Sequence, residues 1–446
     1  MTAASRRRAL RSLRRELRRR KADVLRTLAR ETGRSELECF TTEFVPSVAA
    51  LGWLSRNGEQ IHRRTAKLSG LPFRFGMRRV YETRMPLGSV LVIGTWNYPL
   101  QIAWRQIVWA LFAGDRVLFK PSPYAEGSAT LIAEIVATAP EWAGQFSLLP
   151  SDPAQSERVW DEIDGVIFTG STATAQTIAQ KAAERHITAI IEASGNDSII
   201  VGSRGYTMRE VEHIVWALTT HSGETCVAPK LIWLPRAQYN DQLQLLDAAL
   251  SDYVATERWK GYTTPNIPKA IATYKQTALS LGATIRTEVQ GQLLVVELRS
   301  AADAATLTEA CLASDGIPFA PVLACVPYDD LAEPLEWSNG PFAGLGTTTF
   351  AMTSSERRQC EHMCGTSFVS HSEAVVAAGI PAIAMGGRGA SGIGRSGGLE
   401  LLLQLTRSRT IVSPGLGASL ALPRWAIFNG KDAIGHRFLQ RMMRKY

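Results

Sequence analysis

Several features that would mark a secreted, membrane-spanning or metal-binding protein are scarce in this sequence of 446 residues. It has six cysteines and no Cys-x-x-Cys pair, so we expect neither a disulfide framework nor a zinc site, and this usage fits a reducing cytosol. No run of roughly 18 apolar residues is present, which argues against a transmembrane helix. No apolar stretch follows the N-terminal arginines, which argues against a secretory signal. We therefore expect a cytoplasmic, globular protein without a metal ion.

Positive charge is concentrated at the two ends of the chain. The formal net charge is +8, and the first twenty residues carry nine arginines. Leucines at helical spacing predict one long basic helix over residues 4–31. We favour a helix that packs on its own domain, over one that lies on an anionic membrane or binds nucleic acid. The tail from Arg424 to Tyr446 mixes basic and apolar residues, so peripheral membrane contact through both ends stays open, whereas no nucleic-acid partner is expected.

Apolar runs that alternate with helical patterns predict a doubly wound α/β fold in the first half of the chain. The expected strands are 89–94, 117–120, 145–149, 165–168, 187–191 and 198–201. The expected helices between them are 101–113, 124–138 and 173–185. A second α/β unit is expected after residue 202, because strand and helix patterns alternate again there.

A short turn at residues 221–229 contains the most reactive side chain type in the sequence. Cys226 lies there between Gly223 and Pro229, which restrict the local backbone and can present a thiolate to a cleft. A lone cysteine is more often a small buried apolar residue. The turn alone therefore leaves both interpretations open.

Further candidates follow strand ends, where α/β folds bind their ligands. Lys120 ends one strand, and is either a ligand-binding lysine or a solvated loop residue. Gly170 and Ser171 open a helix whose free N–H groups suit an anion, although this junction does not carry the Gly-x-Gly-x-x-Gly fingerprint. Glu192 ends another strand and is either a general base or a turn residue. The glycine-rich run 385–395 fits a flexible linker or a tight packing loop.

Five segments, in this order and at this spacing, resemble the aldehyde dehydrogenase superfamily. They are Val92–Leu100, Phe119–Ser122, Ile167–Thr172, Gly223–Pro229 and the glycine-rich stretch 386–394. The likeness covers residues 10–412 and is strongest to the class-3 and fatty aldehyde dehydrogenase branch. It implies an α/β fold with a Rossmann-variant cofactor domain, a second α/β catalytic domain and a small oligomerisation element.

The resemblance also implies a division of the chain. Residues 1–202 would form the N-terminal helices and the dinucleotide-binding domain, with an oligomerisation hairpin at about 73–86. Residues 203–395 would form the catalytic thiol domain. Residues 396–446 would return to the cofactor domain and supply an oligomerisation strand and the basic tail. A homodimer is the expected assembly.

The activity that the resemblance implies is the NAD- or NADP-dependent oxidation of an aldehyde, medium- or long-chain aliphatic or aromatic, to its acid. Cys226 would attack the carbonyl carbon. Asn97 and the Cys226 backbone N–H would stabilise the oxyanion, and Glu192 would activate the water that hydrolyses the thioester. The residues expected to bind the cofactor are Lys120, Ser122, Gly170, Ser171, Thr95, Trp96 and Phe319.

Three positions depart from the family pattern. The turn after the base usually reads Glu-Leu-Gly-Gly-Lys, and here residues 192–196 read Glu-Ala-Ser-Gly-Asn. Pro123 stands where the family usually has a carboxylate, so repulsion of a 2′-phosphate is lost and NADP becomes credible beside NAD. Ile317 stands where the family has the glutamate that holds the nicotinamide ribose.

These departures leave two other functions open. One is a reductase that converts an acyl-CoA or another acyl thioester to the aldehyde with the same cysteine, although a retained Glu192 would waste its thioester. The other is a degenerate member of the family that serves as a binding or scaffold protein. The presence of both Cys226 and Asn97 argues against the second.

Overall fold

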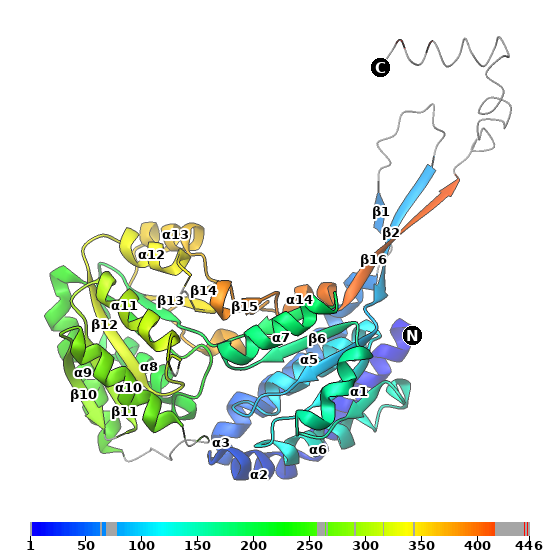
Figure 1. Ribbon diagram of the computed structural model, residues 1–446, viewed down its shortest axis with the longest axis horizontal. Coiled ribbons are helices and arrows are strands. Elements are labelled where there is room, and N and C mark those ends of the chain that lie inside the picture. Colours follow the sequence, from blue (N-terminus) through cyan, green and yellow to red (C-terminus); the bar gives the residue numbers. More distant parts are fainter. Residues whose placement is uncertain are drawn as a thin grey trace. The chain divides into compact units, whose positions relative to one another are not determined.

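The computed structural model describes residues 2–62, 65–67, 78–256, 264, 266–289, 291–314, 316–341 and 344–414, with Arg441 and Arg444. The chain divides into a larger unit, residues 1–59 and 86–406, and a smaller unit, residues 60–85 and 407–446. Apart from Arg441 and Arg444, the predicted basic tail lies outside the described residues. Figure 1 gives the order of the elements along the chain, and each unit is described below by itself.

The N-terminal segment is helical, but the single helix predicted over residues 4–31 is wrong. Its helices are α1 (Ala3–Arg19), α2 (Lys21–Thr32), α3 (Glu36–Cys39) and α4 (Val45–Asn57), with one π-helical turn at Phe40–Phe44. The two helices meet at Arg20, and α1 packs mainly on α4, whereas α2 packs on α6 (Glu126–Val136), which α1 also contacts. Gly33 then ends α2 in the left-handed conformation, with φ of 68°.

A six-stranded sheet forms the first half of the larger unit. In spatial order its strands are β15 (Gly392–Ile393), β7 (Thr188–Glu192), β6 (Gly165–Thr169), β3 (Ser89–Ile93), β4 (Arg116–Lys120) and β5 (Phe146–Leu148). All neighbours except the β15–β7 pair run parallel. The helices α5 (Gln101–Ala113), α6 and α7 (Thr172–Glu184) pack against these strands. Five strands and three helices predicted from the sequence are present within a few residues.

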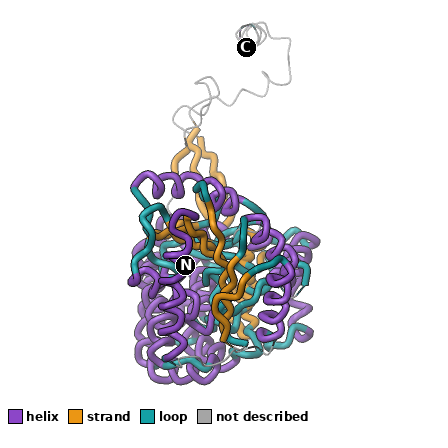
Figure 2. The backbone as a smooth tube through the Cα atoms, turned by 90° about the vertical axis from the view of Figure 1, so that its left-hand side faces the viewer, coloured by secondary structure: helices purple, strands orange, loops and turns teal. Residues whose placement is uncertain are grey.

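A seven-stranded sheet forms the second half. In spatial order its strands are β10 (Thr284–Val289), β11 (Leu293–Glu297), β12 (Val322–Tyr328), β9 (Leu231–Pro235), β8 (Ser198–Val201), β13 (Gly346–Phe350) and β14 (Phe368–His371). The strand β8 thus joins this sheet, four residues before the boundary expected at residue 202. Figure 2 shows the strands of the larger unit between helices.

Both faces of the seven-stranded sheet are covered by helices. On β9, Leu231 and Trp233 pack with α10 (Ile267–Ser280) and α11 (Ala301–Leu312), because alternate strand residues point to opposite faces. Ile232 and Leu234 pack with α8 (Met208–Thr219) and α9 (Tyr239–Ala255) on the other face. The remaining helices are α12 (Ala332–Asn339), α13 (Ser354–Met363) and α14 (Gly398–Gln404).

The smaller unit contains a three-stranded sheet. Its strands, in spatial order, are β1 (Thr65–Lys67), β2 (Arg78–Pro86) and β16 (Thr406–Pro414). Residues 68–77, which include part of the predicted hairpin, lie outside the described residues. The sheet therefore joins the second half of that hairpin to the strand predicted near the C-terminus.

Candidate active site

The carboxyl ends of four parallel strands bring most of the predicted site segments to one edge of the six-stranded sheet. Ile93 pairs with Lys120 on one side and with Phe168 on the other, and Thr169 pairs with Glu192. The segments that follow these residues therefore leave the sheet at one level. This edge is where open α/β sheets bind ligands.

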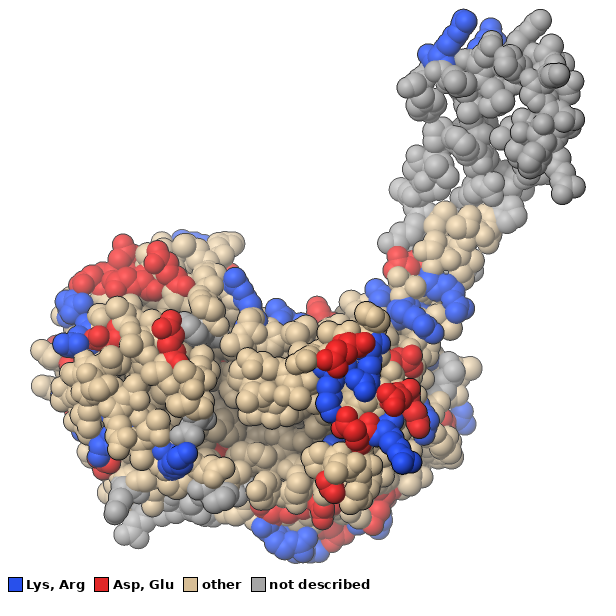
Figure 3. Space-filling view, viewed as in Figure 1, with Lys and Arg blue, Asp and Glu red and all other residues tan. Residues whose placement is uncertain are grey.

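A cleft of about 480 Å³ opens at this edge. Seven of the ten predicted site residues line it: Thr95, Trp96, Asn97, Gly170, Ser171, Cys226 and Phe319. The other lining residues are Thr169, Thr172, Ala173, Gln176, Ala193, Ser194, Thr264, Asn266, Ile267, Ala270, Leu312, Ser314, Gly316, Ile317, Pro318 and Ala390. None of these described residues is acidic or basic, and Figure 3 shows a hollow on the larger unit that is bordered mostly by uncharged residues.

The turn that carries Cys226 has an unusual backbone. His221, Ser222 and Gly223 follow one another with φ of 53°, 54° and 71°, all left-handed. This conformation costs roughly 1–2 kcal/mol for each residue other than glycine, so surrounding contacts must hold it. At Gly223 a side chain cannot be added, because a Cβ would lie 2.3 Å from the backbone nitrogen of Pro321.

Two hydrogen bonds connect the Cys226 turn to the segment after β3. The Asn97 side-chain nitrogen Nδ2 donates to the Glu224 carbonyl at 3.0 Å, and the Tyr98 and Thr225 hydroxyls lie 2.9 Å apart. Thr95 Oγ1 donates to Asn97 Oδ1 at 2.7 Å, which fixes the orientation of the amide. Nδ2 carries a second hydrogen besides the one donated to Glu224, and Asn97 is one of the residues that line the cleft. An oxyanion donor held in this way typically contributes about 3–4 kcal/mol to transition-state stabilisation.

Two charged residues that the sequence patterns did not reveal, Arg34 and Glu43, hydrogen-bond to the backbone of residues 97–101, which follow β3. Arg34 Nη1 donates to the Asn97 carbonyl at 2.6 Å, and lies 3.7 Å from a carboxylate oxygen of Glu43. Glu43 Oε2 accepts the backbone N–H groups of Leu100 and Gln101 at 2.9 and 3.0 Å, and so caps α5. Burial raises the pKa of Glu43 to about 7, although Arg34 opposes this shift. Their signal in the sequence is faint, because both lie in a segment that reads only as helix and turn.

Glu192 is buried and is not among the residues that line the cleft. Its Oε2 accepts a hydrogen bond from the Ser396 hydroxyl, and its negative charge acts on the Cys226 thiol and raises the pKa of that thiol. The glycine-rich stretch packs directly against it, since Gly392 pairs with Glu192 and a Cβ on Gly392 would lie 2.1 Å from the Ile191 carbonyl. Of the two interpretations of this stretch, the structure therefore supports a packing loop.

The surroundings of Cys226 disfavour the thiolate. Burial and the negative charges of Glu192 and Asp197 raise the pKa of the thiol well above its usual value, and the Arg105 charge opposes them. Asp197 lies in the turn after Glu192 and accepts the N–H groups of Leu345 and Gly346 at 2.6 and 3.0 Å. Ionisation of the thiol therefore depends on how far the positive charge of Arg105 offsets the two carboxylates.

Lys120 and Ser122 lie at the same sheet edge but are not among the residues that line the cleft. Lys120 Nζ donates to the Pro121 carbonyl at 3.3 Å, and Ser122 Oγ accepts the Tyr124 N–H at 3.3 Å. Burial lowers the pKa of Lys120, and Asp152 opposes this shift. A carboxylate therefore does act on Lys120, but it comes from the segment after β5 rather than from position 123.

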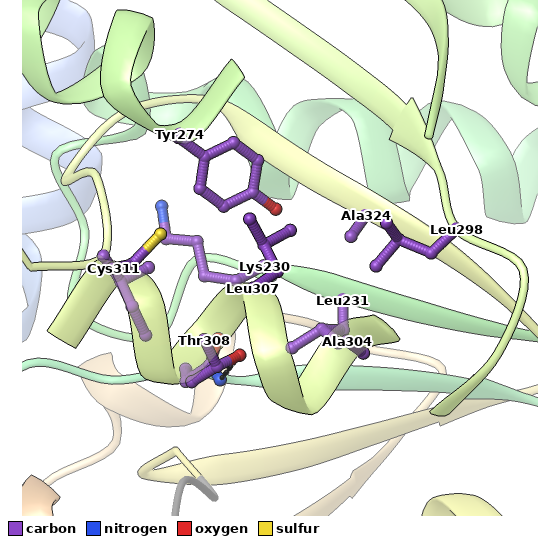
Figure 4. A pocket seen from close by; sticks show the side chains of 11 residues that line it. Lys230, Leu231, Tyr274, Leu298, Ala304, Leu307, Thr308, Cys311 and Ala324 are labelled. Atoms are coloured by element: carbon purple, nitrogen blue, oxygen red, sulfur yellow. Dashed lines mark hydrogen bonds between the residues drawn. The ribbon is translucent and has the colours of Figure 1, made fainter. Parts of the chain in front are cut away.

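The segment that carries Ile317 and Phe319 is supported by a buried lysine. The rings of Phe319 and Trp96 meet edge to face at 5.7 Å, and Lys230 Nζ donates to the next carbonyl, that of Ala320, at 2.6 Å. Burial lowers the pKa of Lys230 to about 7, with Asp197 opposing. Figure 4 shows Lys230 among Tyr274, Leu307 and Cys311 around a void of about 10 Å³, too small for a ligand.

The cleft fits a dinucleotide in two respects. The first turn of α7, capped by Ser171, presents backbone N–H groups that can hold a pyrophosphate without a basic side chain. The Trp96 and Phe319 rings supply an apolar wall near Cys226. Ile317 lines the cleft where the family has its ribose glutamate, so that contact is missing.

The sequence model of the aldehyde dehydrogenase family matches residues 1–411. The 4,4'-diapolycopene-4,4'-dial dehydrogenase of Cytobacillus firmus is 26% identical over 337 residues, which cover 71% of this chain and 69% of that protein. Aldehyde dehydrogenase family 3 member A2 of Mus musculus is 27% identical over 249 residues, covering 55% of this chain and 50% of that one. The dimeric NADP-preferring aldehyde dehydrogenase of Canis lupus familiaris is 26% identical over 314 residues, covering 69% and 68%.

Among solved structures, the aldehyde dehydrogenase of Mycobacterium tuberculosis complexed with NAD+ has the same fold, with a TM-score of 0.80 at 20% identity over 93% of this chain and 86% of that one. The protein belongs to the aldehyde dehydrogenase family. The family and fold expected from the five sequence segments are confirmed, as is the class of enzyme, an aldehyde dehydrogenase that uses NAD or NADP. The alignment with this chain covers about half of the mouse relative, and just over two thirds of the Cytobacillus and dog relatives.

Among the described helices, none is both long and apolar enough to cross a membrane.

Proposed function

We propose that this protein oxidises an aldehyde to the carboxylic acid through a thioester on Cys226. The main support is that Cys226, Asn97 and the Gly170–Ser171 junction line one cleft, and that the buried Glu192 carboxylate acts on the Cys226 thiol. In this scheme the six-stranded sheet carries the cofactor side and the seven-stranded sheet carries the thiol side.

Cys226, Asn97 and Glu192 each have one role in the proposed oxidation. The Cys226 thiol first loses its proton to solvent. Its sulfur then bonds to the aldehyde carbon, and Asn97 Nδ2 and the Cys226 N–H stabilise the oxygen as an anion. Bound NAD or NADP supplies the acceptor for the hydride that leaves this carbon. Glu192 then takes a proton from water, whose oxygen attacks the thioester carbon and displaces the sulfur as thiolate. The acid leaves, and Glu192 returns its proton to solvent.

The substrate class is proposed to be an apolar aldehyde, medium- or long-chain aliphatic or aromatic. Buried Val227, Leu345 and Met385 form an apolar cluster in which Cys226 itself packs. Further partly buried apolar members of this cluster are Phe368, Val375, Ala378 and Ile383. Removing apolar substrate area from water here would contribute about 25 cal/mol per Å².

The test is reduced-cofactor absorbance with a panel of aliphatic and aromatic aldehydes, assayed with NAD and with NADP, and identification of the acid product. An acyl-CoA with reduced cofactor is run in parallel. Aldehyde-dependent cofactor reduction with acid as product supports the proposal. Aldehyde formation from the acyl-CoA, with no acid formed from any aldehyde, would favour the reductase that the missing ribose glutamate at Ile317 suggests.

The choice between NAD and NADP is proposed to depend on Asp152. Because Asp152 acts electrostatically on Lys120, it would repel a 2′-phosphate bound there. Asp152→Asn keeps an oxygen for the Ala154 N–H and is expected to raise the NADP-to-NAD ratio of kcat/KM about threefold at low salt, with less effect at high salt. Asp161→Asn, an exposed change in the same region, is the control; equal shifts in both variants would refute the assignment.

We also propose that the protein forms a homodimer and that its basic N-terminal helix contacts membranes peripherally. The β1–β2–β16 sheet supplies the strand elements expected to pair between subunits, and a dimer would have twice the chain mass of 48.7 kDa in light scattering.

The exposed arginines of α1 include Arg11, Arg14, Arg15 and Arg18, which border an open basic groove. Pelleting with anionic, but not neutral, vesicles at low salt would support a membrane contact.

A further inference from the structure

The helix after Asn97 contains a buried cation that none of the roles above uses. Every residue of α5 is buried, and Arg105 is 4% exposed in its second turn. Its Nη1 donates to the Ala378 carbonyl at 3.3 Å, whereas its Nε has no acceptor. Among the described residues, no carboxylate oxygen lies within 4.0 Å of its guanidinium.

A buried charge without an ion-pair partner is expensive, so a protein that keeps one normally uses it electrostatically. Burial lowers the pKa of Arg105, and the two groups that oppose this shift are Glu192 and Cys226. Both are the reacting groups of the proposed chemistry. The geometry places Arg105 beside both groups. Ala378, whose carbonyl Arg105 binds, packs in the same apolar cluster as Cys226. The next residue of the helix, Gln106, donates to the Thr169 hydroxyl at 2.9 Å, and Thr169 pairs with Glu192 in the sheet.

We propose that Arg105 is a positioning residue that makes the Cys226–Glu192 pair reactive, by supplying the positive charge that offsets its single negative charge. This inference rests on the proposed function. When one proton is left on the two groups, the pair carries a single negative charge, whether the sulfur or the carboxylate holds that proton. Arg105 favours this state over the fully protonated one, in which no nucleophile forms.

The other charges around the sulfur act in the opposite sense. Glu192 on β7 and Asp197 before β8 both disfavour the thiolate, and the Tyr98 phenol is a neutral neighbour whose ionisation the sulfur opposes. Of the charged groups that act on the sulfur, Arg105 on α5 favours the thiolate. Without Arg105, the remaining two charges, those of Glu192 and Asp197, are both negative, so the thiol should hold its proton to higher pH.

Gln101 provides a matched control. It lies one turn before Arg105 on the same helix, and its Nε2 donates to the same Ala378 carbonyl at 3.2 Å. Gln101→Met removes a comparable anchor of the 376–379 segment but removes no charge. Arg105→Met removes the anchor and the charge, and Arg105→Lys restores the charge alone.

The experiment measures the rate of Cys226 alkylation by iodoacetamide against pH in the enzyme without cofactor, with the labelled peptide identified by mass spectrometry. Arg105→Met is expected to move the midpoint up by about one pH unit and to slow alkylation at pH 7 about tenfold. Arg105→Lys should recover most of the shift, and Gln101→Met should leave the midpoint in place. If Arg105→Met does not fold, Arg105→Gln takes its place.

An unchanged midpoint in a folded Arg105→Met or Arg105→Gln variant would overturn the inference, as would an equal shift in Gln101→Met. These outcomes are separate from the failure of the proposed function. If wild-type protein oxidises aldehydes and its alkylation profile does not respond to Arg105, the function stands and only the role of Arg105 is refuted. If wild-type protein acts on no aldehyde, the function itself fails.

Discussion

Cys226→Ser is expected to lower kcat/KM for aldehyde oxidation by about 10⁴-fold or more, close to complete loss. A serine hydroxyl is a far weaker acid than a thiol, and this site already raises the pKa of the thiol through burial and two carboxylates. A single arginine charge cannot ionise a hydroxyl there. Serine also bonds to carbon as an ester, which is a poorer acyl intermediate for hydrolysis than a thioester.

The measurement is reduced-cofactor absorbance with the best aldehyde found, on variants that keep the wild-type melting temperature. Cys364→Ser is the matched control, since Cys364 is also half-buried but lies at the end of α13, outside the cleft. Its activity should remain within about twofold of wild type. Activity of Cys226→Ser within tenfold of wild type would remove Cys226 from the chemistry and return it to the small buried residue that a lone cysteine usually is.

The candidate residues at the edge of the six-stranded sheet could be predicted because each lies next to the strand pattern that identifies it in the sequence. An apolar run followed by a glycine, lysine or glutamate can be recognised within ten residues, and parallel strands bring such ends to one level whatever lies between them. Lys120, Gly170 and Glu192 were found in this way, and the register of β3, β4, β6 and β7 brings these strand ends to one edge of the sheet.

Arg105 and Arg34 were not found, because their roles depend on contacts between segments far apart in the sequence. Arg105 does leave a signal: in a helix whose other residues, apart from Gln106, are apolar, Gln101 and Arg105 are polar and four residues apart. Such a pair at one face of a buried helix indicates a specific polar partner, here the Ala378 carbonyl. Arg34 leaves no comparable pattern, since it follows the glycine that ends α2.

The altered turn after Glu192 shows which part of the family pattern this fold requires. Gly195 is retained, and a Cβ there would lie 2.1 Å from the Cys226 carbonyl oxygen, so a larger residue would displace the catalytic turn. At position 196 the family's lysine is replaced by asparagine, and Lys230, the residue before β9, lines the same small void as Asn196. A lysine is therefore present beside this position although it comes from another segment, which sequence comparison at one position does not reveal.

Glu192→Gln is expected to separate the two halves of the reaction. Hydride transfer needs Cys226 and Asn97, whereas hydrolysis needs a base, so the variant should release about one equivalent of reduced cofactor per Cys226 and then slow. Loss of a general base typically costs 10²–10⁴-fold, and we expect steady-state kcat to fall by about 10³-fold. Glutamine keeps the volume of the buried side chain and an oxygen for the Ser396 hydroxyl.

Intact-mass spectrometry of the quenched reaction should show one acyl group on the protein, and digestion followed by peptide mass spectrometry should place it on the peptide that contains Cys226. Ser396→Ala is the matched control, because it removes the hydrogen bond to Glu192 Oε2 and leaves the carboxylate in place. Its kcat should fall by less than about tenfold, with no accumulated thioester. Steady turnover by Glu192→Gln at the wild-type rate would contradict the role of Glu192 as the base. A variant that accumulates thioester and then passes it to coenzyme A would instead show that only this carboxylate separates the oxidation from acyl-thioester chemistry.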